Sequence, residues 1–383
     1  MVAIAAVIFA GALILQLPQV QTFAVSKVTD ILSEKLDGDI TFEKLHFRPF
    51  TTLVLKNVSI TDRNPAKDPA APKKEVIDTF FRAGYIIAKF SLEGLTGSEG
   101  IHIRKAYISD AQMNLVLENA PAGSEKGMEN LSRIFRLKKG KKDKKQPKDK
   151  ELFHIKKVEI NNMGFALINH KSKKTPYSGG INWNDMDIKN IRINARDLMF
   201  KSGVMSGELD QLSFREKSGF TCRSISGKAK VGNGRTIVED LKLDDGLSDI
   251  NLPLYMMSYN SAEDFGDYIN KVRMDAIIDE SKIDFRTISY FAPSLKDNRL
   301  IVSASGKVDG FVRDLRFNEI KAKSAAGGFS GTVNGRLTGL PDIENTGIEA
   351  TVNNFNITTE GLGIFVSEWM KQGELDLSRF AKG

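Results

Sequence analysis

Side chains alternate between apolar and polar along most of residues 41–358. Leu300 and Val302, for example, alternate with Arg299 and Ser303. A period of two places successive side chains on opposite faces of a β-strand. Segments with this period recur along the chain, with Gly, Pro, Asn and Asp between them. The sequence therefore predicts a mainly β fold that contains only a few short helices.

The predicted strands share this alternation and end at turn residues. They lie at 41–47, 53–62, 85–95, 100–111, 113–119, 152–162, 164–170, 187–198, 207–216, 224–232, 235–243, 272–281, 299–310, 329–339 and 348–358. Three short helices are predicted at 129–135, 261–270 and 362–371, and Ser261 is the expected N-cap of the second. The glycine pairs of GKVDG (306–310) and GTVNG (331–335) lie inside strands, where they predict bulges or close backbone approach.

The first 26 residues carry no charged side chain, and Val2–Leu15 is an apolar run with one Gly. A full span needs about 20 residues, and the 14 residues of this run are short for it. The chain continues without charge to Val20, which leaves room for a tilted span that ends near Pro18. A signal-peptide core is the alternative, but no small-x-small cleavage site follows the run. A buried helix of a soluble domain is a third interpretation. We predict a transmembrane anchor over 1–18, with the apolar residues Val2, Ile4, Val7, Ile8, Phe9, Leu13, Ile14 and Leu15.

An amphipathic juxtamembrane helix is predicted over residues 19–37, because Val20, Ala24 and Val28 fall on one helical face and Gly38 ends the pattern. No basic residue precedes Val2. Since positive charge marks the cytoplasmic side of an anchor, we expect basic residues ahead of this segment in the native protein.

The net charge of +7 comes mostly from one segment. Residues 138–150 hold eight Lys and two Asp, an excess of +6. A block of this composition without apolar residues is typical of a disordered, solvated loop, here 137–151. Contact with lipid headgroups or nucleic acid is the alternative, but the remainder of the chain is nearly neutral. We therefore predict no nucleic-acid partner.

No motif for covalent chemistry is found. His46, His102, His154 and His170 lack metal-ligand spacing, and Cys222 is the only cysteine. Phosphate loops, nucleophile elbows and dinucleotide fingerprints are also missing. We expect a protein that is not an enzyme and that needs neither a metal nor another cofactor.

Two stretches carry a family resemblance. Residues 17–62 (LPQVQTFAVSKVTDILSEKLDGDITFEKLHFRPFTTLVLKNVSITD) combine a Pro after the anchor, a helix ending in Leu-x-Gly, and strands of the form L-x-L-x-x-V-x-I-x-D. Residues 101–135 add paired strands, a polar loop and an Asn-Leu helix. This order resembles the AsmA-like superfamily and, within it, the TamB-like proteins of the translocation and assembly module. Such proteins are usually longer, so we expect the native chain to continue beyond Gly383.

The resemblance implies a protein anchored in the inner membrane of a Gram-negative bacterium, with most of its chain in the periplasm. It implies an elongated, curved β-sheet whose hydrophobic groove carries phospholipid towards the outer membrane. It also implies an outer-membrane barrel of the Omp85 family as a partner. On this basis, 38–136 form an AsmA-like N-terminal β unit, and 152–383 continue the β groove and are truncated at their C-terminal end.

Residues that would line such a groove come from the apolar strand faces: Leu53, Leu55, Ile101, Ile103, Leu300, Val302, Val333 and Leu337. Alternation alone does not distinguish an open groove from the sealed core of a β-sandwich. Two other functions remain open. One is a scaffold or chaperone for outer-membrane protein assembly that pairs through an exposed strand edge. The other is an envelope hydrolase or sugar-binding β protein.

Overall fold

The computed structural model describes residues 38–48, 52–63, 79–90, 101–117, 130–134, 151–170, 179–342, 345–359 and 361. The predicted anchor, juxtamembrane helix, Lys-rich loop and 362–371 helix lie outside these residues. The described chain is mainly β, with sixteen strands and short helices, as predicted. It divides into two compact units, each considered by itself below. Unit 1 comprises 1–176 and 182–219, and unit 2 comprises 177–181 and 220–383.

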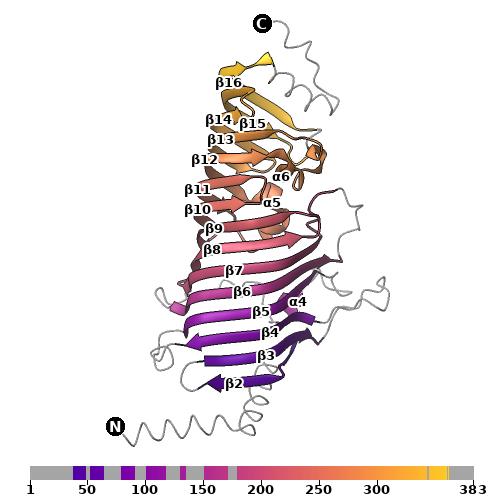
Figure 1. The fold of residues 1–383 in the computed structure, drawn as a ribbon, viewed down its shortest axis with the longest axis vertical. Coiled ribbons are helices and arrows are strands. Elements are labelled where there is room, and N and C mark those ends of the chain that lie inside the picture. The colour runs from indigo at the N-terminus through magenta and orange to yellow at the C-terminus, as the bar shows by residue number, and fades with distance from the viewer. Residues whose placement is uncertain are drawn as a thin grey trace, which may run out of the picture. The chain divides into compact units, whose positions relative to one another are not determined.

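Unit 1 is an open sheet (Figure 1). Its strands are β1 (Gly38–Thr41), β2 (Lys44–Arg48), β3 (Thr52–Asp62), β4 (Thr79–Phe90), β5 (Ile101–Leu117), β6 (Glu151–Asn169), β7 (Asp185–Lys201) and β8 (Val204–Glu216). The strands from β3 to β8 follow one another in chain order, while β1 and β2 both pair with β3. The neighbours are antiparallel, except that β5 and β6 are parallel.

A parallel pair requires a crossover connection, and the chain between β5 and β6 contains helix α4 (Asn130–Ile134). Asn130 fixes this helix to β5. Its Oδ1 accepts a hydrogen bond from the Val116 N–H at 3.0 Å, and its Nδ2 donates to the Asn114 carbonyl at 2.8 Å. Ile134 is fully buried. The helix predicted at 129–135 is thus confirmed. The Asn130 side-chain amide binds the backbone groups of β5 that a neighbouring strand would otherwise pair with.

Unit 2 is antiparallel throughout, with its strands paired in chain order. The strands are β9 (Thr221–Gly232), β10 (Arg235–Asp244), β11 (Asp249–Ser258), β12 (Arg273–Asp284), β13 (Ile301–Phe311), β14 (Asp314–Ser324), β15 (Phe329–Thr338) and β16 (Gly347–Ile357). The helical turns η1 (Ala262–Asp267) and α5 (Tyr268–Lys271) separate β11 from β12. The turns α6 (Phe285–Ser289) and η2 (Pro293–Leu295) separate β12 from β13. Ser261 is the N-cap of η1, as predicted.

Several predicted strand boundaries are wrong. The predicted strand 41–47 is two strands, whereas 100–111 and 113–119 form the single strand β5, and 152–162 and 164–170 form β6. Strand β14 is missing from the predicted set, and so is β11, in which Pro253 lies. Strand β11 pairs with β12 at Asp249 and again from Leu254 onward. Pro253, which has no N–H group to donate, lies between these two paired segments, where no hydrogen bond to β12 is needed.

A polar clasp holds the start of α6 in unit 2. Asp245 Oδ1 accepts hydrogen bonds from the backbone N–H groups of Leu247 and Ser248, at 2.9 and 2.7 Å. The hydroxyl of Thr287 donates to Asp245 Oδ2, and the Ser248 hydroxyl donates to Thr287 Oγ1. Asp284 caps α6 by accepting from the Arg286 N–H at 2.9 Å. We define the α6 clasp as Asp245, Ser248, Asp284, Arg286 and Thr287.

The single cysteine belongs to the interior of unit 2. Cys222 is 1% exposed, and burial raises the pKa of its thiol to about 11. Because only the thiolate is a strong nucleophile, a buried thiol of this pKa is unreactive at neutral pH. Cys222 is therefore a small apolar core residue in this protein.

Gly306 is required by its backbone conformation and by its surroundings. Its φ is +141°, and a Cβ built there would lie 2.6 Å from the Glu319 carbonyl oxygen. The prediction of close backbone approach at this glycine is confirmed. Gly306→Ala is expected to lower the free energy of unfolding of unit 2 by about 2–4 kcal/mol, as measured by denaturant titration.

Gly327→Ala is the matched control for this substitution. Gly327 also has a positive φ (+74°), but a Cβ added there would meet nothing within 4 Å. The control should lose only about 1 kcal/mol, the cost of a left-handed conformation alone. Equal losses in the two variants would show that the carbonyl contact at Gly306 is unimportant.

Candidate functional site

A row of unusual backbone conformations crosses unit 1. Asn57 in β3, Asp110 in β5, Asn162 in β6 and Asn190 in β7 all have φ between +50° and +58°. Gly84 of β4 lies at the same level of the sheet. Its neighbours Ala83 and Tyr85 pair with the residues on either side of Asn57 in β3 and of Asp110 in β5. Asn and Asp are, after Gly, the residues that tolerate this conformation best. We call these five positions the left-handed row, although Gly84 itself does not have a positive φ.

The apolar alternation changes phase at the left-handed row. In β3, Leu53 and Leu55 precede Asn57 at odd positions, and Val58 and Ile60 follow it at even positions. A residue that interrupts extended geometry re-aims the side chains beyond it. We infer that each left-handed residue shifts the alternation by one position. The apolar side chains before and after it therefore lie on the same face of the strand.

Register then aligns the apolar side chains of successive strands into rows. On one side of the left-handed row run Leu55–Ile86–Ile108–Ile160–Ile193–Leu212 and Leu53–Ala88–Ala106–Val158–Ala195–Leu209. On the other side, in β3 to β6, run Val58–Ala83–Ala111–Met163–Ile191 and Ile60–Phe81–Met113–Phe165–Ile188; in β7 itself, Ile191 lies on the Ile193 side of Asn190. We call the face formed by these rows the apolar face of unit 1.

Much of the apolar face is only half-buried. The row that begins at Leu55 and ends at Leu212 is intermediate in exposure at every position. The shorter row from Val58 is more enclosed, with Val58, Ala83, Ala111 and Ile191 between 3% and 8% exposed. Side chains in a sealed sandwich core would be covered by a second layer. Among the described elements of unit 1, the short helix α4 is the only one that is not a strand.

Two of the four predicted groove residues of unit 1 fall into these rows. Leu53 and Leu55 each begin one of them on β3. Ile103 lies further along β5, in register with Phe90, Ile155 and, through Ile155, Leu198. The backbone of Ile101 pairs with Phe153, and its side chain is outside the described residues. The four strand positions therefore belong to one continuous paired sheet.

The predicted residues of unit 2 separate into two kinds. Val333 pairs with Ile320 and Val352, and Leu337 pairs with Leu315 and Ile348; both are half-buried. Leu300 and Val302 are instead 6% and 9% exposed. The Leu300 carbonyl accepts a hydrogen bond from the Phe285 N–H at the start of α6, so these two pack beside the helical turns.

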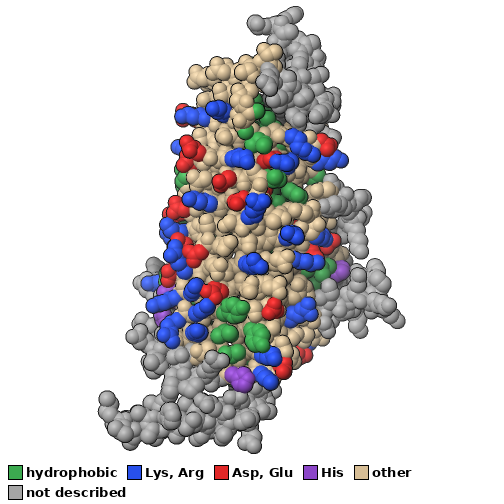
Figure 2. All heavy atoms as spheres, viewed as in Figure 1, with side chains coloured by type: hydrophobic (Ala, Val, Ile, Leu, Met, Phe, Trp, Pro, Cys, Tyr) green, Lys and Arg blue, Asp and Glu red, His purple; other side chains and the backbone are tan. Residues whose placement is uncertain are grey.

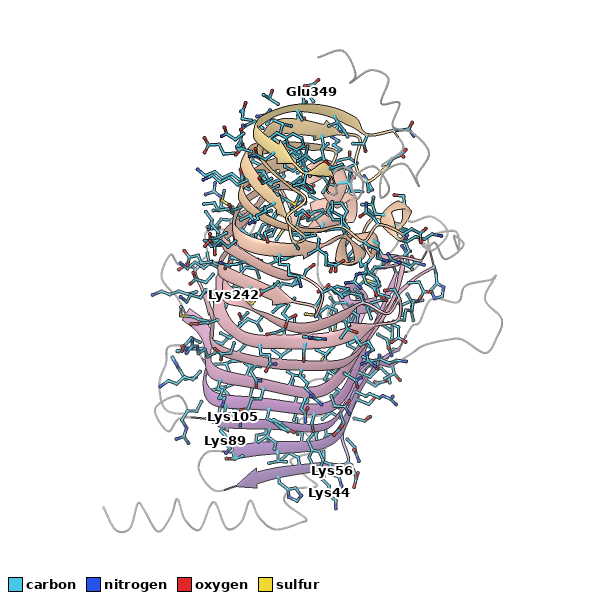
Figure 3. All side chains as sticks on the ribbon, turned by 45° about the horizontal axis from the view of Figure 1, so that its top comes forward. Lys44, Lys56, Lys89, Lys105, Lys242 and Glu349 are labelled. Atoms are coloured by element: carbon cyan, nitrogen blue, oxygen red, sulfur yellow. The ribbon has the colours of Figure 1, made fainter. Side chains whose placement is uncertain are left out.

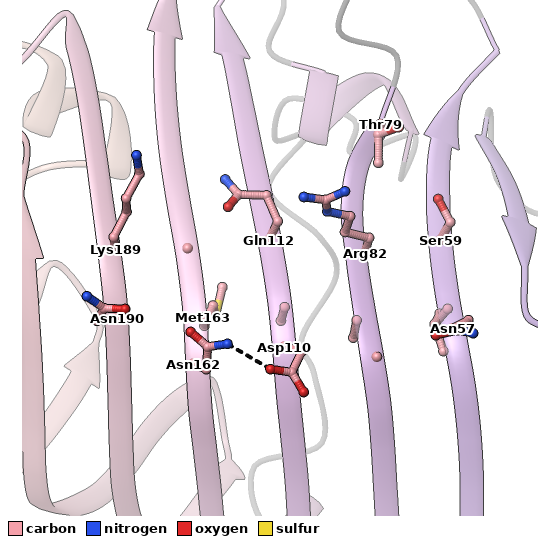
Figure 4. A pocket seen from close by; sticks show the side chains of 15 residues that line it. Asn57, Ser59, Thr79, Arg82, Asp110, Gln112, Asn162, Met163, Lys189 and Asn190 are labelled. Carbon is pink, nitrogen blue, oxygen red and sulfur yellow. Dashed lines mark hydrogen bonds between the residues drawn. The ribbon is translucent and has the colours of Figure 1, made fainter.

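A polar hollow of about 760 Å³ follows the left-handed row (Figure 4). Arg82 and Gln112 are cross-strand partners in its wall, and Gly84 and Gly164 contribute no side chain to it. The Asn162 Nδ2 donates a hydrogen bond to Asp110 Oδ1 at 2.7 Å. The hollow offers amide, hydroxyl, cationic and carboxylate groups beside apolar side chains, and it was not predicted from the sequence.

The sequence does contain a signal for the left-handed row. Polar–Asn/Asp–apolar triplets occur where the alternation slips, at 56–58, 109–111, 161–163 and 189–191. If the triplets in β5 and β6 are interpreted as turns, each of these strands is divided in two, as in the predicted boundaries. If they are interpreted as bulges within a long strand, they identify the left-handed row and, with it, the apolar face.

Groups that could support metal chemistry are sparse in the described residues. No cluster of three or more His, Cys, Asp or Glu residues there is arranged to hold a metal ion. His154 lies 3.1 Å from Asp197 and beside His102, with 6.2 Å between ring centroids, so only a pair of imidazoles and one carboxylate meet. Within the described part of the chain, no helix is long and apolar enough to cross a membrane, and the anchor predicted at 1–18 lies outside it.

Comparisons with known proteins add no family to these observations. A scan against protein-family models gave no match, and a search of curated proteins found no relative. The arguments on function below therefore rest on this chain's own residues and on the resemblance described above.

Proposed function

We propose that this protein is a lipid conduit anchored in the inner membrane, which moves phospholipid through the periplasm towards the outer membrane. The observation that carries the proposal is the apolar face of unit 1, where aligned Leu, Ile, Val and Phe side chains are half-buried on a sheet. The resemblance to the AsmA-like superfamily adds the expectation of a curved, groove-like sheet and of an outer-membrane barrel of the Omp85 family as partner.

The physical role of such a face is to shield acyl chains from water. Each methylene removed from water contributes about 0.8 kcal/mol, so a lipid tail gains substantially by lying on the rows from Leu53 and Leu55. The register keeps each row continuous from β3 to β8. A chain can therefore slide from one strand to the next without crossing a polar side chain, and no bond has to be made or broken.

A photo-crosslinking amino acid at Ile103 tests this function. Under the proposal, irradiation in cells attaches phospholipid to the protein, which mass spectrometry of the purified adduct identifies. Capture of polypeptide alone at this position would overturn the conduit proposal.

The second candidate function is a scaffold for outer-membrane protein assembly, and β16 favours it. Within the described residues, β16 has a strand neighbour on one side only, β15. Ile348, Val352 and Phe355 are 69%, 48% and 54% exposed. An exposed edge strand with apolar side chains is a template for pairing with another strand. A photo-crosslinker at Val352 that captured an outer-membrane barrel protein would support this function.

A further inference from the structure

We propose that the polar face of unit 1 over β2–β5 is a docking surface for an anionic phospholipid bilayer. This surface lies opposite the apolar rows by strand alternation. The proposal does not depend on lipid transport, because it concerns contact with a membrane surface and not the holding of single lipids.

The first observation is a pair of unfavourable contacts between like charges. Lys44 and Lys56 are direct cross-strand partners on β2 and β3, and Lys89 and Lys105 are partners on β4 and β5. Figure 3 shows the two pairs at separate places on the sheet, the first on β2 and β3 and the second on β4 and β5. Like charges directly opposite each other destabilise a sheet. Because two such pairs occur within four strands, we infer that an external partner with negative charge binds this surface and offsets the repulsion.

The partners of these lysines inside the protein are few. Lys105 Nζ lies 2.5 Å from Glu159 Oε2, and Lys56 Nζ lies 5.9 Å from the centre of the Tyr85 ring. Lys44 and Lys89 are exposed and form no ion pair with any described residue. At least two of the four cations are therefore available to an external anion.

The second observation is an apolar centre between the two lysine pairs. Val54, Ile87 and Tyr107 are neighbours on β3, β4 and β5, and all three are half-buried. Tyr85 lies beside them on β4, 41% exposed. Figure 2 shows hydrophobic side chains gathered over the N-terminal strands with Lys and Arg around them. We define the lysine-rimmed patch as Lys44, Lys56, Lys89, Lys105, Val54, Tyr85, Ile87 and Tyr107.

This combination fits a bilayer better than an acidic protein. Lysine is depleted in the centres of protein interfaces, whereas arginine is preferred where a carboxylate must be held in a fixed geometry. Tyrosine and lysine are the residues that meet lipid headgroups, because their apolar stems enter the interface while their polar ends stay in water. Near an anionic bilayer, each lysine strengthens binding about five-fold.

The test uses the full chain reconstituted in vesicles, with an environment-sensitive fluorophore on Tyr85→Cys. Cys222 is buried and should remain unlabelled. Phosphatidylcholine vesicles with or without phosphatidylglycerol are compared, so that the uncharged N-terminal segment contributes equally to both. We expect a blue shift of emission in the anionic vesicles only, and its loss in about 1 M salt, where the Debye length falls to ~3 Å.

Two quadruple variants separate the patch from general charge. K44Q/K56Q/K89Q/K105Q should abolish the blue shift. The matched control K156Q/K157Q/K189Q/K201Q removes the same charge from β6 and β7 and should retain it. Equal shifts in neutral and anionic vesicles, or equal losses in the two variants, would overturn the proposal. A shift that needs no vesicles and grows with protein concentration would also overturn it, in favour of a second copy of the chain.

Discussion

Ile193→Lys is expected to reduce the phospholipid that copurifies with the protein by at least ten-fold. Ile193 lies in the row that begins at Leu55, paired with Ile160 on β6 and Leu212 on β8. A lysine among acyl chains costs about 2.5–3.5 kcal/mol at the centre of a bilayer, and its flexible stem recovers part of this by reaching water. The remaining cost corresponds to ten-fold or more. Phosphate analysis per mole of purified chain measures the effect.

Asn194→Lys is the matched control, because Asn194 is the next residue on the same strand and faces the other way. Its partners, Glu159 and Gln211, are polar. The same charge at this position should leave the lipid content within two-fold of the wild type. If both lysine variants lost lipid equally, the loss would reflect damage to β7, and the apolar face would not be the lipid site.

Asp284→Ala is expected to destabilise unit 2 by about 2–4 kcal/mol. Asp284 is fully buried, caps α6 and binds the Arg286 guanidinium through both carboxylate oxygens. Its removal costs a helix cap, worth about 1 kcal/mol, and leaves the partly buried Arg286 cation without its partner. Hydrogen exchange of β12 and β13 amides should report the loss, while β4–β6 amides in unit 1 serve as an internal reference.

The effect of Asp284 should depend on pH in a defined direction. Burial alone would raise the pKa of Asp284, but the hydrogen bonds and charge of Arg286 outweigh it and lower the pKa. A carboxylate with a lowered pKa contributes stability above its unfolded pKa of about 3.9, and this stability is lost as pH falls through the folded value. The difference between wild type and Asp284→Ala should therefore shrink below about pH 4.

Asp314→Ala provides the comparison for an exposed ion pair. Asp314 binds Arg336, and the two side chains are 31% and 45% exposed. Exposed pairs contribute about 0–1 kcal/mol, so this variant should lose less than 1 kcal/mol. Losses of similar size in Asp314→Ala and Asp284→Ala would contradict the importance given to burial in the α6 clasp.

The sequence was sufficient to predict a mainly β fold with a few short helices, because alternation with a period of two has few structural solutions. It was insufficient where local signals have two meanings. An Asn or Asp at the end of an alternating run indicates a turn or a left-handed bulge, and only pairing with neighbours decides between them. Asp110 and Asn162 lie directly beside each other in the sheet, which a local pattern does not reveal. The parallel pairing of β5 with β6 was hidden for the same reason.

The candidate lipid face shows a similar division. Leu53 and Leu55 could be assigned to one apolar face from alternation, and register places them in continuous rows. Ile103 lies beyond the register shift at Lys89 and Phe90, where alternation alone does not fix its face. Leu300 and Val302 show the same alternation but are buried. The helical turns between β12 and β13 were not predicted, so nothing in the alternation separated these two residues from the half-buried positions.

A photo-crosslinking scan along β7 tests the central claim that acyl chains lie on the apolar face of unit 1. With the crosslinker placed at each position in turn in detergent-purified protein, phospholipid should be captured at Met186 and Ile188, before Asn190, and at Ile193 and Ala195, after it. The intervening positions Asp187, Lys189, Arg192 and Asn194 should capture none. This change from even to odd positions follows from the left-handed residue at Asn190. Capture without a change of phase, or no capture at any position, would contradict the account.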